Sequence, residues 1–175
     1  MKVLLPLMFA ASLASTVVAA GPAHQHGVAM LDVAVEAGRV TLELSTPVDN
    51  LLGFERPPRT DAERQQAQAA VAKLKAAASL FRIDGAAGCT LGTVTLKSAV
   101  LGLGRTLAAA DKEGHAELEG RFEFNCKAGT RAGFIEVGLF DAFAPLKRID
   151  LQLVSPKGQM KATLVRPASR VALVR

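Results

Sequence analysis

The chain has 175 residues, a formal net charge of +5 and neither tryptophan nor tyrosine. The positive balance is modest, and lysine and arginine form no run along the sequence. Without such a run, and without Trp or Tyr to stack on bases, the composition argues against a nucleic-acid partner.

Residues 1–20 are typical of a secretory signal peptide. After a short basic start, the apolar stretch is brief and rich in alanine and serine, and small residues stand at positions −3 and −1 of a cut before Gly21. A cut after Ala23 is the alternative. No later stretch is long and apolar enough to span a bilayer. We therefore expect residues 21–175 to form a single exported domain with no membrane span once the signal is cleaved.

Two of the three histidines, His24 and His26, stand one residue apart just after the expected cut. In an extended segment, side chains at i and i+2 lie on the same face, about 7 Å apart. Two imidazoles placed in this way can bind one zinc or copper ion. The alternative is a polar N-terminal tail that contains two histidines by chance, and the pair alone does not decide between these readings.

Alternating apolar and polar residues predict two strands, 31–36 and 40–45, joined as a hairpin. Residues 48–53 are expected to form a loop or a short turn of helix. The sequence Thr60-Asp61-Ala62-Glu63 is a capping box, and it predicts a helix that runs to about Ser79. The stripe along this helix consists of small residues, so its role is packing against the sheet.

The chain has two cysteines, Cys89 and Cys126. Export places them in an oxidising compartment, which favours a disulfide between them. Such a bond would close the loop from Cys89 to Cys126, and the chain-entropy model gives it a stabilisation of about 4 kcal/mol. The rival interpretation, in which both thiolates join histidines on a zinc ion, is weaker because the cysteines have no tight ligand spacing.

The clearest strand pattern runs from His115 to Cys126, with alternate residues apolar. Residues 99–114 are weakly patterned and are expected to form a loop. Further strands follow at 134–140, 149–153 and 160–165, with short connections that favour antiparallel pairing. The predicted fold class is α+β: an antiparallel β-sheet with one principal α-helix packed on it, and one disulfide.

His115 and Glu117 share the polar face of that strand, and both side-chain types bind zinc. The candidate metal ligands are therefore His24, His26, His115 and Glu117. A solvated strand face is the alternative for the last two, but it explains His115 less easily, because His115 is the only histidine outside the N-terminal pair. No G-x-S-x-G sequence or paired-carboxylate pattern indicates a catalytic residue, so we expect no enzyme activity.

Several segments together resemble the ZrgA-like zinc-regulated proteins of the Gram-negative periplasm, a family once described as a domain of unknown function. They are the opening His-x-His-Gly, the run from Asp49 to Glu55, the two cysteines, and the stretch from Gly138 to Phe143. The resemblance implies a periplasmic protein that binds zinc, assists its uptake and hands it to a component of a zinc importer.

Two departures from the family pattern bear on this function. Relatives usually carry a His/Asp-rich tract where residues 99–114 have no histidine, and Arg56 stands where relatives often have histidine. The resemblance therefore implies reduced capacity, at most about one zinc ion. We also expect Glu55 to hold its loop by pairing with Arg56 rather than to bind metal. The alternative function is a non-catalytic periplasmic interaction module that has lost metal binding.

Overall fold

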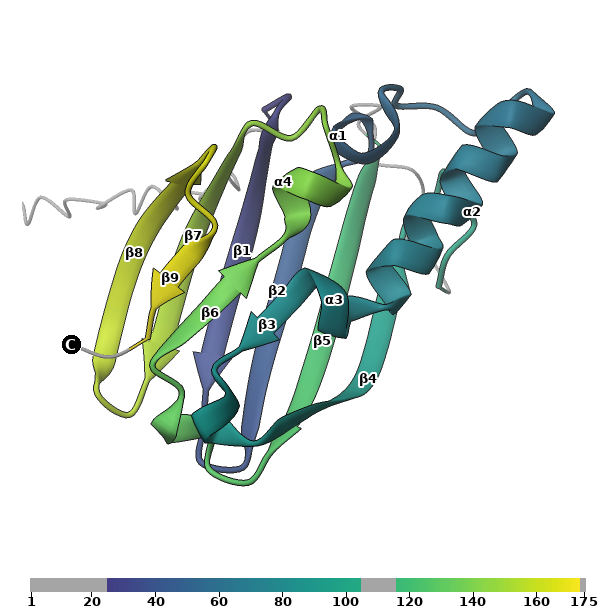
Figure 1. The fold of residues 1–175 in the computed structure, drawn as a ribbon. Helices are drawn as coiled ribbons and strands as arrows, with labels where there is room; N and C mark the ends of the chain where they lie inside the picture. The colour runs from purple at the N-terminus through teal and green to yellow at the C-terminus, as the bar shows by residue number, and fades with distance from the viewer. Residues whose placement is uncertain (1–24, 105–115, 174–175) are drawn as a thin grey trace, which may run out of the picture.

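The computed structural model describes residues 25–104 and 116–173. The expected signal peptide, His24 and His115 lie outside these residues. The main element is a six-stranded sheet with the strand order β4-β5-β2-β1-β7-β8 (Figure 1). Its strands are β1 (Val28–Val35), β2 (Arg39–Pro47), β4 (Cys89–Lys97), β5 (Glu117–Cys126), β7 (Arg148–Ser155) and β8 (Gly158–Val165).

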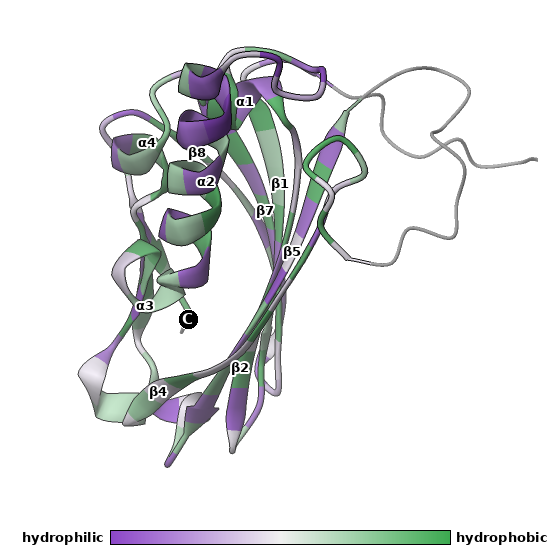
Figure 2. Ribbon diagram, turned by 90° about the vertical axis from the view of Figure 1, so that its right-hand side faces the viewer, coloured by the Kyte–Doolittle hydropathy of each residue, from purple (hydrophilic) through white to green (hydrophobic). Residues whose placement is uncertain are grey.

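One face of this sheet is covered by a second layer (Figure 2). The layer contains a three-stranded sheet of β3 (Phe81–Ile83), β6 (Phe134–Val137) and β9 (Arg170–Ala172), in the order β3-β6-β9. It also contains the helices α1 (Asp49–Leu52), α2 (Asp61–Lys75), α3 (Ala77–Leu80) and α4 (Leu139–Ala142). Among the described residues, no helix is long and apolar enough to cross a membrane.

The hydrophobic core lies between the two layers. Alternate residues of the large sheet point into it, and Leu42, Phe122 and Ile149 are fully buried there. From the opposite layer, Phe81 packs against Phe122 with the ring centroids 5.0 Å apart. On β5, the polar residues alternate with the buried ones and face away from the core. The strand faces predicted from the alternation are therefore confirmed.

The predicted hairpin is present as β1 and β2, which pair antiparallel. The sheet is mixed, however, because β1 and β7 pair in parallel, from Val28 beside Arg148 to Ala34 beside Val154. The expectation of a purely antiparallel sheet is therefore corrected. Short connections require antiparallel pairing only between strands adjacent in sequence, and β1 and β7 are far enough apart along the chain to run in parallel.

The expected principal helix is divided in two. The capping box is confirmed, since Thr60 Oγ1 accepts a hydrogen bond from Glu63 N at 3.1 Å and Glu63 Oε2 accepts one from Thr60 N at 3.2 Å. α2 then ends at Lys75, because Ala76 leaves helical geometry at φ −82° and ψ 42°. After this change of direction, Ala77 and Leu80 of α3 are buried. The stripe of small residues therefore does not continue along a single helix.

The disulfide joins Cys89 to Cys126, as expected, with an S–S distance of 2.07 Å. The two cysteines lie directly opposite each other on β4 and β5. The bond therefore ties the edge strand of the large sheet to its neighbour. It also removes both thiolates from any set of metal ligands.

Candidate metal centre

Three side chains converge at the end of the sheet where β1 begins: those of His26, Asp49 and Glu55. His26 Nδ1 lies 2.5 Å from Asp49 Oδ2, and His26 Nε2 lies 3.6 Å from Glu55 Oε1. All three offer ligand atoms within 4.8 Å of one another, and theirs is the one such group of His, Cys, Asp and Glu in the described part of the chain. We call these residues the His26 site.

Each residue of the His26 site comes from a different local structure. His26 lies in the turn before β1, which is closed by a hydrogen bond from Val28 N to Gln25 O at 3.0 Å. Asp49 is the first residue of α1. Gly53 then ends α1 with φ +77°, a conformation that glycine adopts without strain, and this turns the chain so that Glu55 comes back beside His26.

Asp49 supplies an observation that points to a cation. Its Oδ1 atom is buried and has no hydrogen-bond partner among the described residues. A carboxylate oxygen that has lost water and gained no donor is costly to keep charged. A bound cation beside Asp49 would offset that cost, and His26, with 66 % of its side chain exposed, leaves the site open to an ion from solvent.

The expectation that Glu55 pairs with Arg56 is wrong. Both terminal nitrogens of Arg56 bind Glu63 instead, at 3.0 and 2.6 Å. Arg56 also lies over the ring of the half-buried Phe54, with Cζ 5.1 Å from its centroid. Glu63 is held in place by the capping box, and it binds the Arg56 guanidinium on the side of α2. Glu55 is therefore not paired with Arg56 and lies beside His26 instead.

Glu63 gives this loop a measurable pH dependence. Hydrogen bonds from Arg56, and from the backbone amide of Arg59, lower the pKa of Glu63 from 4.5 to about 2. A depressed carboxyl pKa stabilises the fold above the unfolded value, and this contribution disappears as pH falls from about 4.5 toward about 2. The stability gap between wild type and Glu63→Gln should therefore be largest near neutral pH and close on acidification. Urea unfolding of both proteins across this range checks it, and a gap that did not change with pH would contradict it.

Of the four ligands expected from the sequence, the structure places His26 in the site. Glu117 lies on β5, where its carboxylate accepts a hydrogen bond from the Ser45 hydroxyl, and it is not a member of the three-residue group. His24 and His115 lie outside the described residues. As candidate ligands, Asp49 was missed and Glu55 was set aside in favour of a structural role. The run Asp-Asn-Leu-Leu-Gly-Phe-Glu nevertheless contained a signal: a glycine placed to turn the second acid back toward the first.

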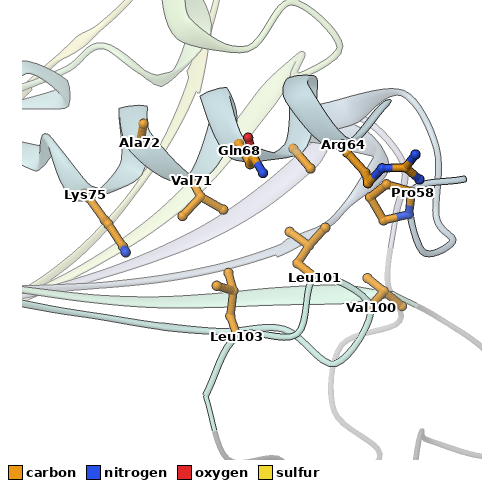
Figure 3. A pocket seen from close by; sticks show the side chains of 10 residues that line it. Pro58, Arg64, Gln68, Val71, Ala72, Lys75, Val100, Leu101 and Leu103 are labelled. Atoms are coloured by element: carbon orange, nitrogen blue, oxygen red, sulfur yellow. The ribbon is translucent and has the colours of Figure 1, made fainter. Parts of the chain in front are cut away.

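A separate hollow of about 390 Å³ lies between α2 and the turn after β4 (Figure 3). Its walls are mainly apolar, with Val71 on the helix facing Leu101 and Leu103 on the turn. The described residues that line it include no histidine, cysteine, aspartate or glutamate. It therefore offers none of these metal-ligand side chains, and the His26 site is the candidate metal centre of the described residues.

Fold and site together define a sheet-rich domain with a mainly antiparallel mixed sheet, one disulfide and a candidate metal site of one imidazole and two carboxylates. Residues 23–173 match the family model described as ZrgA family zinc uptake protein, so the chain belongs to this family. The resemblance seen in the sequence is thereby confirmed. A search of curated proteins found no match.

Proposed function

We propose that this protein is a periplasmic zinc-binding protein that assists zinc uptake and holds at most about one ion, at the His26 site. The observation that carries the proposal is the convergence of His26, Asp49 and Glu55 beside a buried, unpartnered carboxylate oxygen. Membership of a zinc uptake family supports zinc as the ion. The role is binding and transfer, without catalysis.

The geometry suggests a role for each side chain. One zinc ion binds one nitrogen of an imidazole, and Nε2 is the nitrogen that faces Glu55. With zinc on Nε2 and Glu55, the Nδ1–H group donates to Asp49 Oδ2, which fixes the ring in the required tautomer. Asp49 is then the orienting partner of His26, and its charge balances the cation.

The site is open rather than closed. A structural zinc site has four protein ligands, whereas a catalytic zinc site has three and keeps one position for water or substrate. The described residues of the His26 site supply fewer than four. His24, and either His115 or Glu117, remain proposed as further ligands that the ion can gain beyond the described group, and a component of a zinc importer remains the proposed recipient. The exposed imidazole of His26 suits a protein that releases its ion to a partner.

Calorimetric titration of the mature protein with zinc tests the proposal. We expect one ion per chain, with an affinity that falls on acidification, because protons compete with zinc for its ligands. Magnesium at the same concentration is the control and should give no comparable heat, since it prefers oxygen ligands. If wild-type protein bound no zinc, the proposal would fail and the non-catalytic interaction module would be the better account.

A further inference from the structure

We propose that Asn50 is the positioning residue of the metal centre, holding His26 over Asp49 and Glu55 before any ion arrives. This inference rests on the proposed zinc site and adds to it the device that preforms the ligand set. Asn50 is completely buried, at 0 % exposure, although it lies in a helix of four residues near the end of the sheet.

The amide of Asn50 makes three hydrogen bonds, two of them to the segment that carries His26. Asn50 Oδ1 accepts from Gly27 N at 2.6 Å, and Nδ2 donates to Val28 O at 2.8 Å. The third bond runs from Nδ2 to Thr46 Oγ1 at 3.0 Å. A backbone N–H needs an acceptor and a backbone carbonyl needs a donor, so the two partners fix which way the amide points.

Covalent neighbours make this bond relevant to the metal site. Gly27 follows His26 directly, and Asn50 follows Asp49 directly. The Gly27–Asn50 hydrogen bond therefore joins the residue that follows His26 to the residue that follows Asp49. No flexible linker separates the bond from either side chain, so the 2.5 Å approach of His26 to Asp49 depends on it.

Gly27 is held from its other side as well. Its carbonyl accepts hydrogen bonds from Lys147 N at 2.8 Å and from Arg148 N at 2.9 Å. Gly27 has φ +80°, and a Cβ atom built there would lie 3.2 Å from Lys147 Cδ. Any other residue would be strained and crowded at this position. The turn before β1 is thus clamped between Asn50 and the start of β7.

Preformation matters because ordering a loose segment on binding would reduce affinity. We expect Asn50→Ala to weaken zinc binding by about 10- to 100-fold, the usual range for residues that orient metal ligands. Thr46→Val is the matched control: it removes the third partner of the same amide but leaves the bonds to Gly27 and Val28. It should lower stability while zinc affinity stays close to the wild-type value.

Gly27→Ala provides a second variant, which disturbs the same clamp without changing Asn50. It should weaken zinc binding in the same way. If Asn50→Ala does not fold, Gly27→Ala tests whether the clamped turn positions His26. In metal-free protein, NMR contacts between the His26 ring and Asp49 should be present in wild type and Thr46→Val, and lost in both clamp variants.

The results separate this inference from the proposed function. Wild-type affinity and unchanged His26–Asp49 contacts in folded Asn50→Ala, or in Gly27→Ala, would overturn the positioning role even if zinc binds. If wild type bound no zinc, the proposed function would fail, and the metal-free NMR contacts would still decide whether Asn50 positions His26.

Discussion

Replacing His26 with alanine should lower the zinc affinity of the mature protein by about 100-fold or more, since a direct ligand is worth at least as much as the partners that orient it. His26 supplies the only nitrogen ligand among the three residues of the site. Its side chain is mostly exposed, so the substitution should leave the thermal unfolding midpoint nearly unchanged. Calorimetry and thermal unfolding of the same preparations measure both quantities.

Two further variants show whether the effect belongs to the site. Glu55→Gln keeps the size of the side chain and removes the charge, and it should also weaken zinc binding strongly. Glu119→Gln changes an exposed carboxylate on the open face of the large sheet, where it lies 3.8 Å from Lys97, and it should bind zinc as wild type does. Equal binding by His26→Ala and wild type would remove His26 from the site.

His24→Ala tests the pairing expected from the sequence. If zinc needs both histidines of the His-x-His motif, the losses caused by His24→Ala and His26→Ala should be similar. If His26, Asp49 and Glu55 form the main site, the loss caused by His24→Ala should be much the smaller of the two. We expect the second result, because in the proposed site Glu55 supplies the oxygen ligand beside His26 and Asp49 orients the imidazole.

The second large effect concerns the core. Phe122→Ala should lower the free energy of unfolding by about 3–5 kcal/mol, the usual cost of removing a buried aromatic ring. Phe122 is fully buried and joins the two layers through its contact with Phe81. Urea unfolding at neutral pH, with the disulfide intact in both proteins, gives the difference.

Phe134→Ala is the matched control for Phe122. Phe134 is half-buried on β6, with Arg170 Cζ 4.1 Å above its ring, so truncating it leaves a smaller cavity. Phe134→Ala should lower the free energy of unfolding by clearly less than Phe122→Ala does. A loss below about 1 kcal/mol for Phe122→Ala would show that the two layers do not share one core.

The sequence predicted those parts of the fold that depend on local chemistry. Strict alternation placed the buried face of β5, and the capping box at Thr60 placed the start of α2. The parallel pairing of β1 with β7 could not be predicted in this way, because it joins segments more than 100 residues apart and depends on tertiary packing. The break at Ala76 was equally hidden, since alanine is the strongest helix former by intrinsic propensity.

The site was predicted in part for a similar reason. His26 stood out because histidine is rare in this chain and the residue opens a strand. Asp49 and Glu55 did not, because scattered carboxylates are common on protein surfaces and Arg56 suggested a local ion pair for Glu55. What redirected Arg56 is Glu63, a residue whose capping role was recognised from the sequence but whose second partner depends on the folded loop.

Anomalous diffraction at the zinc edge, from crystals of the mature protein prepared with one equivalent of zinc, tests the central claim most directly. We predict one strong peak within about 2.0–2.2 Å of a nitrogen of His26 and a carboxylate oxygen of Glu55, the bond lengths that zinc makes with these ligands. A peak bound elsewhere, or no bound zinc at the His26 site, would contradict the account.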